Sequence, residues 1–114
     1  MKVLMRGVHL TLTDSLREYA NDHLVEPLAR YMDGEAAEMD ISMVDINGPK
    51  GGVDKECRVT VRMPGFSAVH VTETAETMYQ AIAAVRDRLE NTLKRTVEKR
   101  RDNISPGLPE DLRF

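Results

Sequence analysis

The chain has a single cysteine, Cys57, among its 114 residues, and it has no tryptophan. One cysteine cannot form an intramolecular disulfide, and it supplies too few thiolates for a cysteine-based zinc site. Aromatic residues make up only 4% of the chain, which leaves few side chains for a surface that stacks several unpaired bases. These scarcities argue against a disulfide-stabilised secreted domain and fit an intracellular, reducing compartment.

Long hydrophobic runs are also missing. No segment approaches the roughly 20 apolar residues that a helix needs to span a bilayer, and residues 2–6 lack the apolar core of a signal peptide. We therefore predict a cytoplasmic protein without membrane contact. The length and a hydrophobic fraction of 41% favour one domain with its own core. We place this domain at residues 1–102 and predict a flexible tail at residues 103–114, which have no periodic pattern.

The longest helical signal lies in residues 74–101. Apolar residues recur there at steps of three and four, which puts them on one side of a helix that faces a core: Ala75, Met78, Ile82, Val85, Leu89, Leu93 and Val97. Thr74 is the expected N-cap, and the helix is expected to end near Asp102, ahead of Pro106.

The net charge of −3 hides an asymmetry along the chain. Residues 74–101 contain seven Lys and Arg against four Asp and Glu, whereas the rest contains nine against fifteen. On a helical wheel, Arg88, Arg95 and Lys99 form a narrow stripe beside the apolar face, with no acidic residue among them. Two interpretations remain open. The cations match the helix dipole and keep the surface soluble, or they form a row of contacts to a phosphate backbone.

The first third of the chain predicts one strand and one helix. Residues 2–8 alternate well enough for a strand. Thr13 and Asp14 then offer an N-cap and an acidic first turn for a helix that extends to Tyr31. Pro27 is expected to kink or divide this helix because it lacks an N–H and clashes with the preceding turn.

Three further segments change to the period of two that is typical of strands: residues 39–43, 56–63 and 66–72. A loop rich in glycine, residues 47–52, and a tight turn at Pro64 and Gly65 separate them. The order β-α-β-β-β-α predicts an α+β fold, a four-stranded sheet with both helices packed on one face. The first two strands are parallel neighbours if they adjoin. The other face of the sheet then presents Arg58, Thr60, Arg62 and His70.

Nothing in the residue spacing supports catalysis. His9, His23 and His70 lie on separate predicted elements, and Cys57 lies on the inward face of its strand. The glycine-rich loop lacks the spacing and the Lys-Ser/Thr end of a phosphate-binding loop. We expect no enzyme, no cofactor, no metal site and no small-molecule substrate.

Four stretches are specific in combination, because they occur in one order and at fixed spacings. They are the opening strand, Leu12-Thr13-Asp14-x-Leu16-Arg17-x-Tyr19, the segment from Asn47 to Val59, and Met78-Tyr79-x-Ala81-Ile82 with its basic continuation. Over residues 2–101 they resemble the ribosome hibernation promoting factor and ribosome-associated inhibitor A family, also called sigma-54 modulation proteins. Members of this family share the β-α-β-β-β-α fold.

The resemblance implies a short-form factor, without the second C-terminal domain of long members. Such factors bind the small ribosomal subunit in the channel for messenger and transfer RNA and silence translation in starved or resting cells. Members contact ribosomal RNA phosphates with basic residues of both helices. His23, Glu26 and Asn91 stand here where members often carry Arg or Lys. The expected rRNA-binding residues are Arg17, Arg30, Arg86, Arg88, Lys94, Arg95, Lys99, Arg100 and Arg101.

Two other functions are compatible with the sequence. One is a protein-interaction adaptor or homo-oligomeric module that uses the outer sheet face or a strand edge to hold a protein partner or a second copy of itself, without RNA. The other is a binder of double-stranded RNA, since an α-β-β-β-α core also occurs in such domains. The extra first strand and the absence of a marked basic loop count against the latter. A monomer is the expected state.

Overall fold

The computed structural model of the protein describes residues 1–32, 36–46 and 54–103, with side chains described up to Glu98. Four strands form one sheet in the order β1-β2-β3-β4, namely β1 Lys2–Val8, β2 Glu38–Asp45, β3 Lys55–Arg62 and β4 Val69–Ala75. Strand β1 is parallel to β2, and the other two pairs are antiparallel. Residues 47–52 of the glycine-rich loop lie outside the described residues. Of the predicted tail, residues 103–114, Asn103 is the last residue of helix α3 (Met78–Asn103), and residues 104–114 lie outside the described residues.

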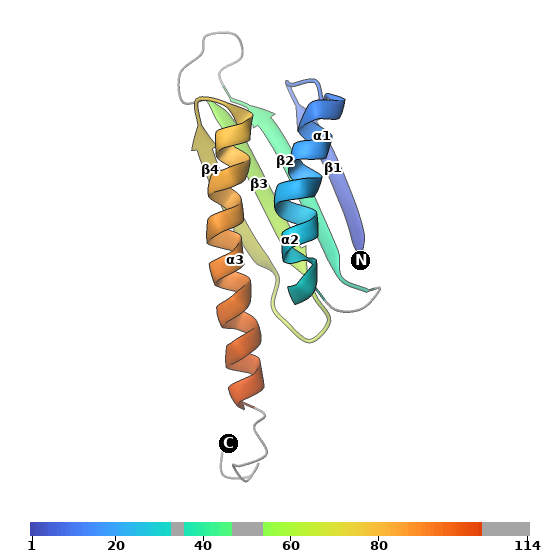
Figure 1. Ribbon diagram of the computed structural model, residues 1–114, viewed down its shortest axis with the longest axis vertical. Coiled ribbons are helices and arrows are strands. Elements are labelled where there is room, and N and C mark those ends of the chain that lie inside the picture. Colours follow the sequence, from blue (N-terminus) through green and yellow to red (C-terminus); the bar gives the residue numbers. More distant parts are fainter. Residues whose placement is uncertain (33–35, 47–53, 104–114) are drawn as a thin grey trace.

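The helices cover one face of this sheet (Figure 1). The first helical stretch, residues 14–31, consists of α1 (Asp14–Ala20), a π-helical turn η1 (Asn21–Val25), α2 (Glu26–Leu28) and a 3₁₀ turn η2 (Ala29–Tyr31). Helix α3 (Met78–Asn103) lies beside it, and its last turns extend past the end of the sheet (Figure 1). The predicted α+β fold, with two helices on one face of a four-stranded sheet and parallel first strands, is confirmed.

Pro27 widens the first helical stretch instead of dividing it. The turn before it is π-helical, and the backbone N–H of Glu26 donates to the carbonyl of Asn21. A wider turn makes room for the proline ring, which in a regular α-helix clashes with the carbonyl four residues earlier. The chain therefore stays helical through Pro27, and Leu24 and Leu28 remain on the same buried side.

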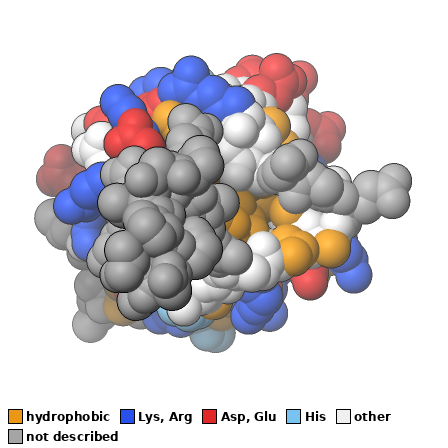
Figure 2. Space-filling model, turned by 90° about the horizontal axis from the view of Figure 1, so that it is seen from below, with side chains coloured by type: hydrophobic (Ala, Val, Ile, Leu, Met, Phe, Trp, Pro, Cys, Tyr) orange, Lys and Arg blue, Asp and Glu red, His pale blue; other side chains and the backbone are white. Residues whose placement is uncertain are grey.

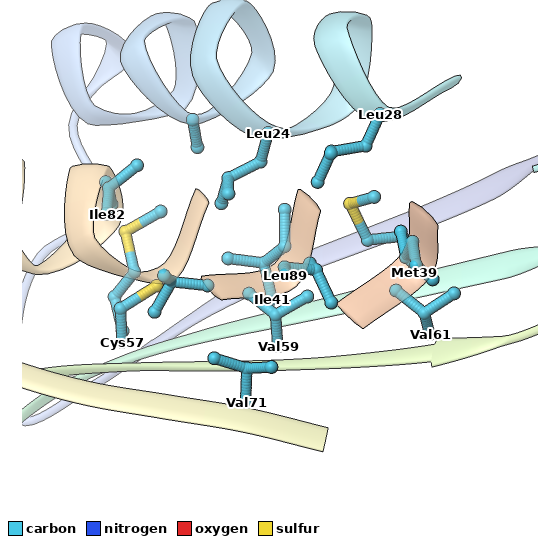
Figure 3. Packing of buried hydrophobic residues seen from close by; sticks show 14 of the residues in the cluster. Leu24, Leu28, Met39, Ile41, Cys57, Val59, Val61, Val71, Ile82 and Leu89 are labelled. Atoms are coloured by element: carbon cyan, nitrogen blue, oxygen red, sulfur yellow. The ribbon is translucent and has the colours of Figure 1, made fainter. Parts of the chain in front are cut away.

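The core lies between the two layers (Figure 3). Leu24 and Leu28 reach it from the first helical stretch, and Ile82 and Leu89 reach it from α3. The sheet meets them with the alternate residues of its central strands, all buried: Met39, Ile41, Cys57, Val59 and Val61. Because strand side chains alternate between faces, the residues between these positions point to the opposite, uncovered face of the sheet.

The start of α3 was predicted wrongly. Thr74 and Ala75 belong to β4, where Thr74 pairs with Glu56 of β3. The cap is Thr77, whose hydroxyl Oγ1 accepts a hydrogen bond of 3.1 Å from the backbone N–H of Gln80. Ala75 is half-buried against the core from the strand, so it extends the apolar stripe of α3 without being helical. The helical wheel alone does not distinguish these two cases.

The predicted last strand, residues 66–72, is displaced in the same way. After the turn at Pro64 and Gly65, the N–H of Phe66 donates to the carbonyl of Met63 over 3.1 Å, and Gly65 has a φ of 83°. Residues 66–68 therefore belong to the connection and not to the strand, and pairing with β3 starts at Val69. At its other end β4 extends to Ala75, and α3 begins only at Met78.

Replacing Thr77 by alanine is predicted to destabilise the protein by about 1 kcal/mol, because it removes the N-cap acceptor of α3. Urea unfolding followed by circular dichroism measures this change. Thr77→Ser retains the hydroxyl and is the matched control, with a stability close to that of the parent. Equal stabilities of Thr77→Ala and Thr77→Ser would contradict the assignment of the cap.

Cys57 is predicted to be inert toward thiol reagents in the folded protein. Burial, with a smaller contribution from the carboxylate of Glu56, raises the pKa of its thiol to about 12. At pH 8 the thiolate fraction is then roughly a thousandfold below that of a free cysteine. A chromogenic disulfide reagent should react at least ~100-fold more slowly with native than with guanidinium-unfolded protein. Similar rates in both states would show that Cys57 is accessible.

Candidate nucleic-acid interface

All nine candidate cations lie in the helix layer, on the first helical stretch or on α3. The two elements are in direct contact near the start of α3, where Tyr19 meets Tyr79 edge to face with ring centroids 4.9 Å apart. Tyr19 also stacks on His23 at 3.8 Å, and His23 donates from Nδ1 to the Tyr19 carbonyl. His23 is thus a packed residue of the helix layer, as its apolar surroundings in the sequence indicate.

Helix α3 carries its cations on two flanks, separated by the side that enters the core. Arg86 lies on the flank facing the first helical stretch, and Arg88 lies on the flank facing β4. Arg95 follows Arg88 by seven residues, which is two helical turns, and so shares its flank. The helical wheel predicts that Arg88 and Arg95 lie on the same side of the helix, and α3 is helical over both residues.

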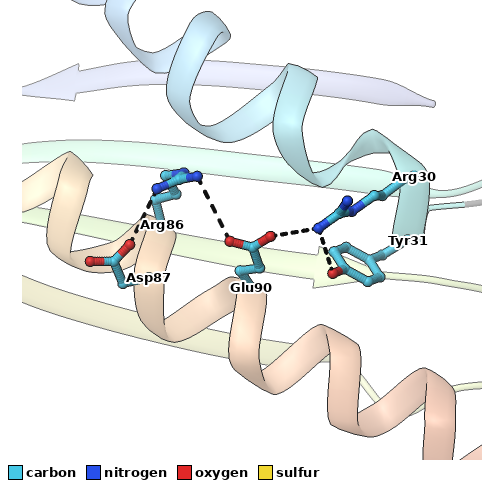
Figure 4. Close-up of polar contacts among 5 residues, drawn as sticks. All are labelled: Arg30, Tyr31, Arg86, Asp87 and Glu90. Atoms are coloured by element: carbon cyan, nitrogen blue, oxygen red, sulfur yellow. Dashed lines mark hydrogen bonds and ion pairs between the residues drawn. The ribbon is translucent and has the colours of Figure 1, made fainter.

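On the first flank, one carboxylate connects the two helices (Figure 4). Glu90 accepts a hydrogen bond of 2.8 Å from Arg30 Nη2 and lies 3.8 Å from Arg86 Nη2. Arg30 also donates to the Tyr31 hydroxyl over 3.0 Å, and Arg86 lies 3.3 Å from Asp87. The hydrogen bond to Tyr31, followed by the contact with Glu90, raises the pKa of the Arg30 guanidinium above its ordinary value.

A shallow hollow of about 410 Å³ adjoins this cluster. Arg30 and Tyr31 line it from the first helical stretch, and Lys94, Val97 and Glu98 line it from α3. Arg30 and Lys94, which are distant in the sequence, thus face one concave surface. Seen from the end at which α3 finishes, basic and acidic side chains lie next to one another on the surface, with apolar side chains between them (Figure 2).

On the second flank, Arg88 is held by strand β4. Its Nη1 donates to the carboxylate of Glu73 and lies 3.4 Å from the Thr72 carbonyl oxygen. Arg95 is exposed, and its Nε lies 3.5 Å from the carbonyl oxygen of Asn91. The third member of the predicted stripe, Lys99, lies in α3 together with Arg100 and Arg101, but the side chains of these three are outside the described ones.

The structure divides the described candidates by their partners. Arg30, Arg86 and Arg88 are engaged by carboxylates. Among the residues whose side chains are described, Arg17, Lys94 and Arg95 are exposed and form no ion pair: they are the uncompensated cations of the helix layer. Arg17 lies about 20 Å along the helix from Arg30, so the set follows the length of the layer and does not form a single cluster.

The acidic partners were missed by the sequence analysis. Glu90 was detectable in principle, because it follows Arg86 by four residues on one helix face. Glu73 was not, because its contact with Arg88 depends on how β4 docks beside α3. The stripe of Arg88, Arg95 and Lys99 contains no acidic residue on the helix, but the fold brings Glu73 of β4 to Arg88.

Other kinds of site find no support in the described part of the chain. No group of three or more His, Cys, Asp and Glu side chains is arranged there to hold a metal ion. None of the described helices is long and apolar enough to cross a membrane. Exposed cations on a helix layer are a feature that a nucleic acid backbone can use, because neutralising its phosphates releases counterions.

Comparison with known proteins identifies the family of the chain. The family model described as "Sigma 54 modulation protein / S30EA ribosomal protein" matches residues 3–101, and the chain belongs to this family. A ribosome hibernation promotion factor of Picosynechococcus sp. is 25% identical over 118 residues, covering 97% of this chain and 60% of the relative. A ribosome hibernation promoting factor of Acinetobacter guillouiae is 26% identical over 106 residues, covering 89% of this chain and 88% of the relative. The chain thus spans only 60% of the length of the first relative.

Solved structures show the same fold. The N-terminal domain of Thermus thermophilus Protein Y is 32% identical, with a TM-score of 0.66 over 83% of this chain and 98% of that domain. A ribosomal subunit interface protein from Coxiella burnetii has the same TM-score at 20% identity, covering 83% of this chain and 96% of its own, a similarity of fold alone.

Removing the Glu90 carboxylate is predicted to leave stability nearly unchanged. The side chain of Arg30 is 67% exposed and that of Glu90 is 25% exposed, and exposed ion pairs contribute little. We expect Glu90→Gln to shift the thermal unfolding midpoint by less than about 2 °C. Asn91→Ala, one residue along the helix, is the control for surface truncation. A loss of about 5 °C or more in Glu90→Gln alone would mean that the carboxylate holds the helices together.

Proposed function

We propose that this protein is a ribosome hibernation factor that binds ribosomal RNA of the small subunit through its helix layer. Membership of the S30EA family supports the ribosome as partner, and two relatives carry the name of ribosome hibernation factors. The observation that carries the proposal is the placement of Arg17, Lys94 and Arg95. Three exposed cations without ion pairs in the described region lie on the two helical stretches that cover one face of the sheet.

The cations that already form ion pairs also contribute to RNA binding in this proposal. Arg30, Arg86 and Arg88 are pre-oriented by Glu90 and Glu73, and a phosphate must displace these carboxylates to bind. Surface ion pairs contribute so little that this exchange costs little. A phosphate also offers Arg a bidentate acceptor, and each contact releases counterions from the RNA. The negative total charge of the chain therefore does not prevent binding at this face.

The mechanism is steric. The two-layer core makes the domain rigid, and phosphate contacts fix its position without reading base sequence. Bound in the channel for messenger and transfer RNA, the domain occupies the volume that these RNAs need. No bond is made or broken in this mechanism, and release restores the ribosome unchanged.

The double reversal Arg88→Glu with Arg95→Glu is predicted to abolish binding to purified small subunits. Co-sedimentation across a salt series measures this, and about four phosphate contacts in the parent predict a slope of log K against log salt of roughly −3 to −4. The matched control, Lys2→Glu with Arg62→Glu, makes the same charge change on the outer sheet face and should retain binding.

Circular dichroism establishes that both double variants are folded. Equal loss in both would mean that net charge and not the helix layer governs binding. Undiminished binding of the Arg88/Arg95 variant would remove this flank from the interface. Binding by the parent that is insensitive to salt, or a stable complex with a protein in the absence of RNA, would favour the adaptor function instead.

A further inference from the structure

The uncovered face of the sheet carries a second basic site. Strands β1 and β3 flank β2, and the register places Arg6 opposite Ser42 and Ser42 opposite Arg58. Neighbouring strands lie about 4.8 Å apart, so the two arginine backbones are about 10 Å apart with a small residue between them. This cross-strand row contains no acidic residue, and the gap above Ser42 is bounded by two guanidinium-bearing side chains.

A pocket of about 440 Å³ lies at this position, within the size range of small-molecule sites. Its polar lining includes Arg6, Arg58, Ser42 and His9. Arg58 donates from Nε to the carboxylate of Glu56, which fixes the guanidinium while both Nη nitrogens remain without a partner among the described residues. Arg6 forms no ion pair in that part of the chain. Asp45 also lines the pocket, but its carboxylate lies 3.6 Å from Lys55 Nζ.

The remaining wall is apolar. Val8, Val44 and Ile46 line the pocket from the ends of β1 and β2. Val8 is 37% exposed and Ile46 is 49% exposed, which makes them two of the few large hydrophobic side chains that face solvent among the described residues. The pocket therefore combines two arginines and a hydroxyl with an apolar surface on the adjacent side.

The backbone at the rim is held in an unusual conformation. His9 has a φ of 56°, in the left-handed region that a non-glycine residue adopts at a cost of about 1 kcal/mol or more. Two residues earlier, a Cβ on Gly7 would lie 2.4 Å from the carbonyl oxygen of Leu10, so only glycine lets the chain turn this tightly. The tight turn keeps His9 at the rim of the pocket.

We propose that this pocket binds a nucleoside 5′-phosphate. The phosphate lies between Arg6 and Arg58, where the free Nη groups donate to its oxygens and the Ser42 hydroxyl donates a further bond. The sugar and base lie against Val8, Val44 and Ile46. This ligand chemistry has two sources, a free nucleotide and the 5′-phosphorylated end of an RNA. The site lies on the face of the sheet opposite the helix layer and does not depend on the proposed ribosome function.

Titration of ¹⁵N-labelled protein with AMP, inorganic phosphate, adenosine, and triadenylate with and without a 5′-phosphate tests the site. We expect amide shifts at Val8, His9, Ser42 and Val44, with AMP binding at least ~10-fold more tightly than phosphate or adenosine, because both parts of the pocket contribute. Shifts with AMP assign a free nucleotide, and shifts only with 5′-phosphorylated triadenylate assign an RNA end.

Arg6→Gln with Arg58→Gln should weaken binding at least ~10-fold, since it removes both charged donors. Lys2→Gln with Arg62→Gln changes the charge of the same sheet face equally, outside the pocket lining, and should leave affinity within about twofold. The proposal is overturned if no probe shifts the pocket amides at millimolar concentration, if phosphate binds as tightly as AMP, or if both double variants lose affinity equally. Ribosome co-sedimentation of the Arg6/Arg58 variant is expected to match that of the parent.

Discussion

The burial of both helices on one face of the sheet is the constraint on which the other features depend. Leu24 and Leu28 from the first helical stretch and Ile82 and Leu89 from α3 belong to one buried cluster with the inward residues of the sheet. Because each helix has only one apolar side, this packing fixes which of its residues are free. The cations of α3 are thereby divided between a flank beside the first helical stretch and a flank beside β4.

Local charge matters more here than the total of −3. Carboxylates from another element, or from the next turn, engage part of the basic set, as Glu73 and Glu90 do. Such pairs hold long side chains in place at the surface, but each ion pair contributes only a small free energy. The counterions released when a polyanion binds through several contacts can contribute more than these pairs do. An acidic protein can in this way present a face suited to phosphate.

The two faces of the sheet differ in kind. The inner face is apolar and covered, whereas the outer face carries a row of Arg6, Ser42 and Arg58 across three strands. The helix layer spreads its positive charge along its length, which suits a nucleic acid backbone. The outer row borders a bounded pocket, which suits a single small ligand. The helix layer and the outer pocket lie on opposite sides of the sheet, so a ligand bound to one surface does not block the other.

The sequence by itself determined the order of elements, the buried stripe of α3 and the alternation of β3, because these follow from local periodicities of 3.6 and 2 residues. It did not determine that α3 starts at Met78, after the cap Thr77, since Ala75 continues the apolar pattern from a strand. It placed Arg88 and Arg95 on one flank, yet only tertiary structure brought Glu73 to Arg88 and Arg6 to the row with Arg58. Those contacts join residues distant along the chain, and strand register and helix docking alone decide which of them meet.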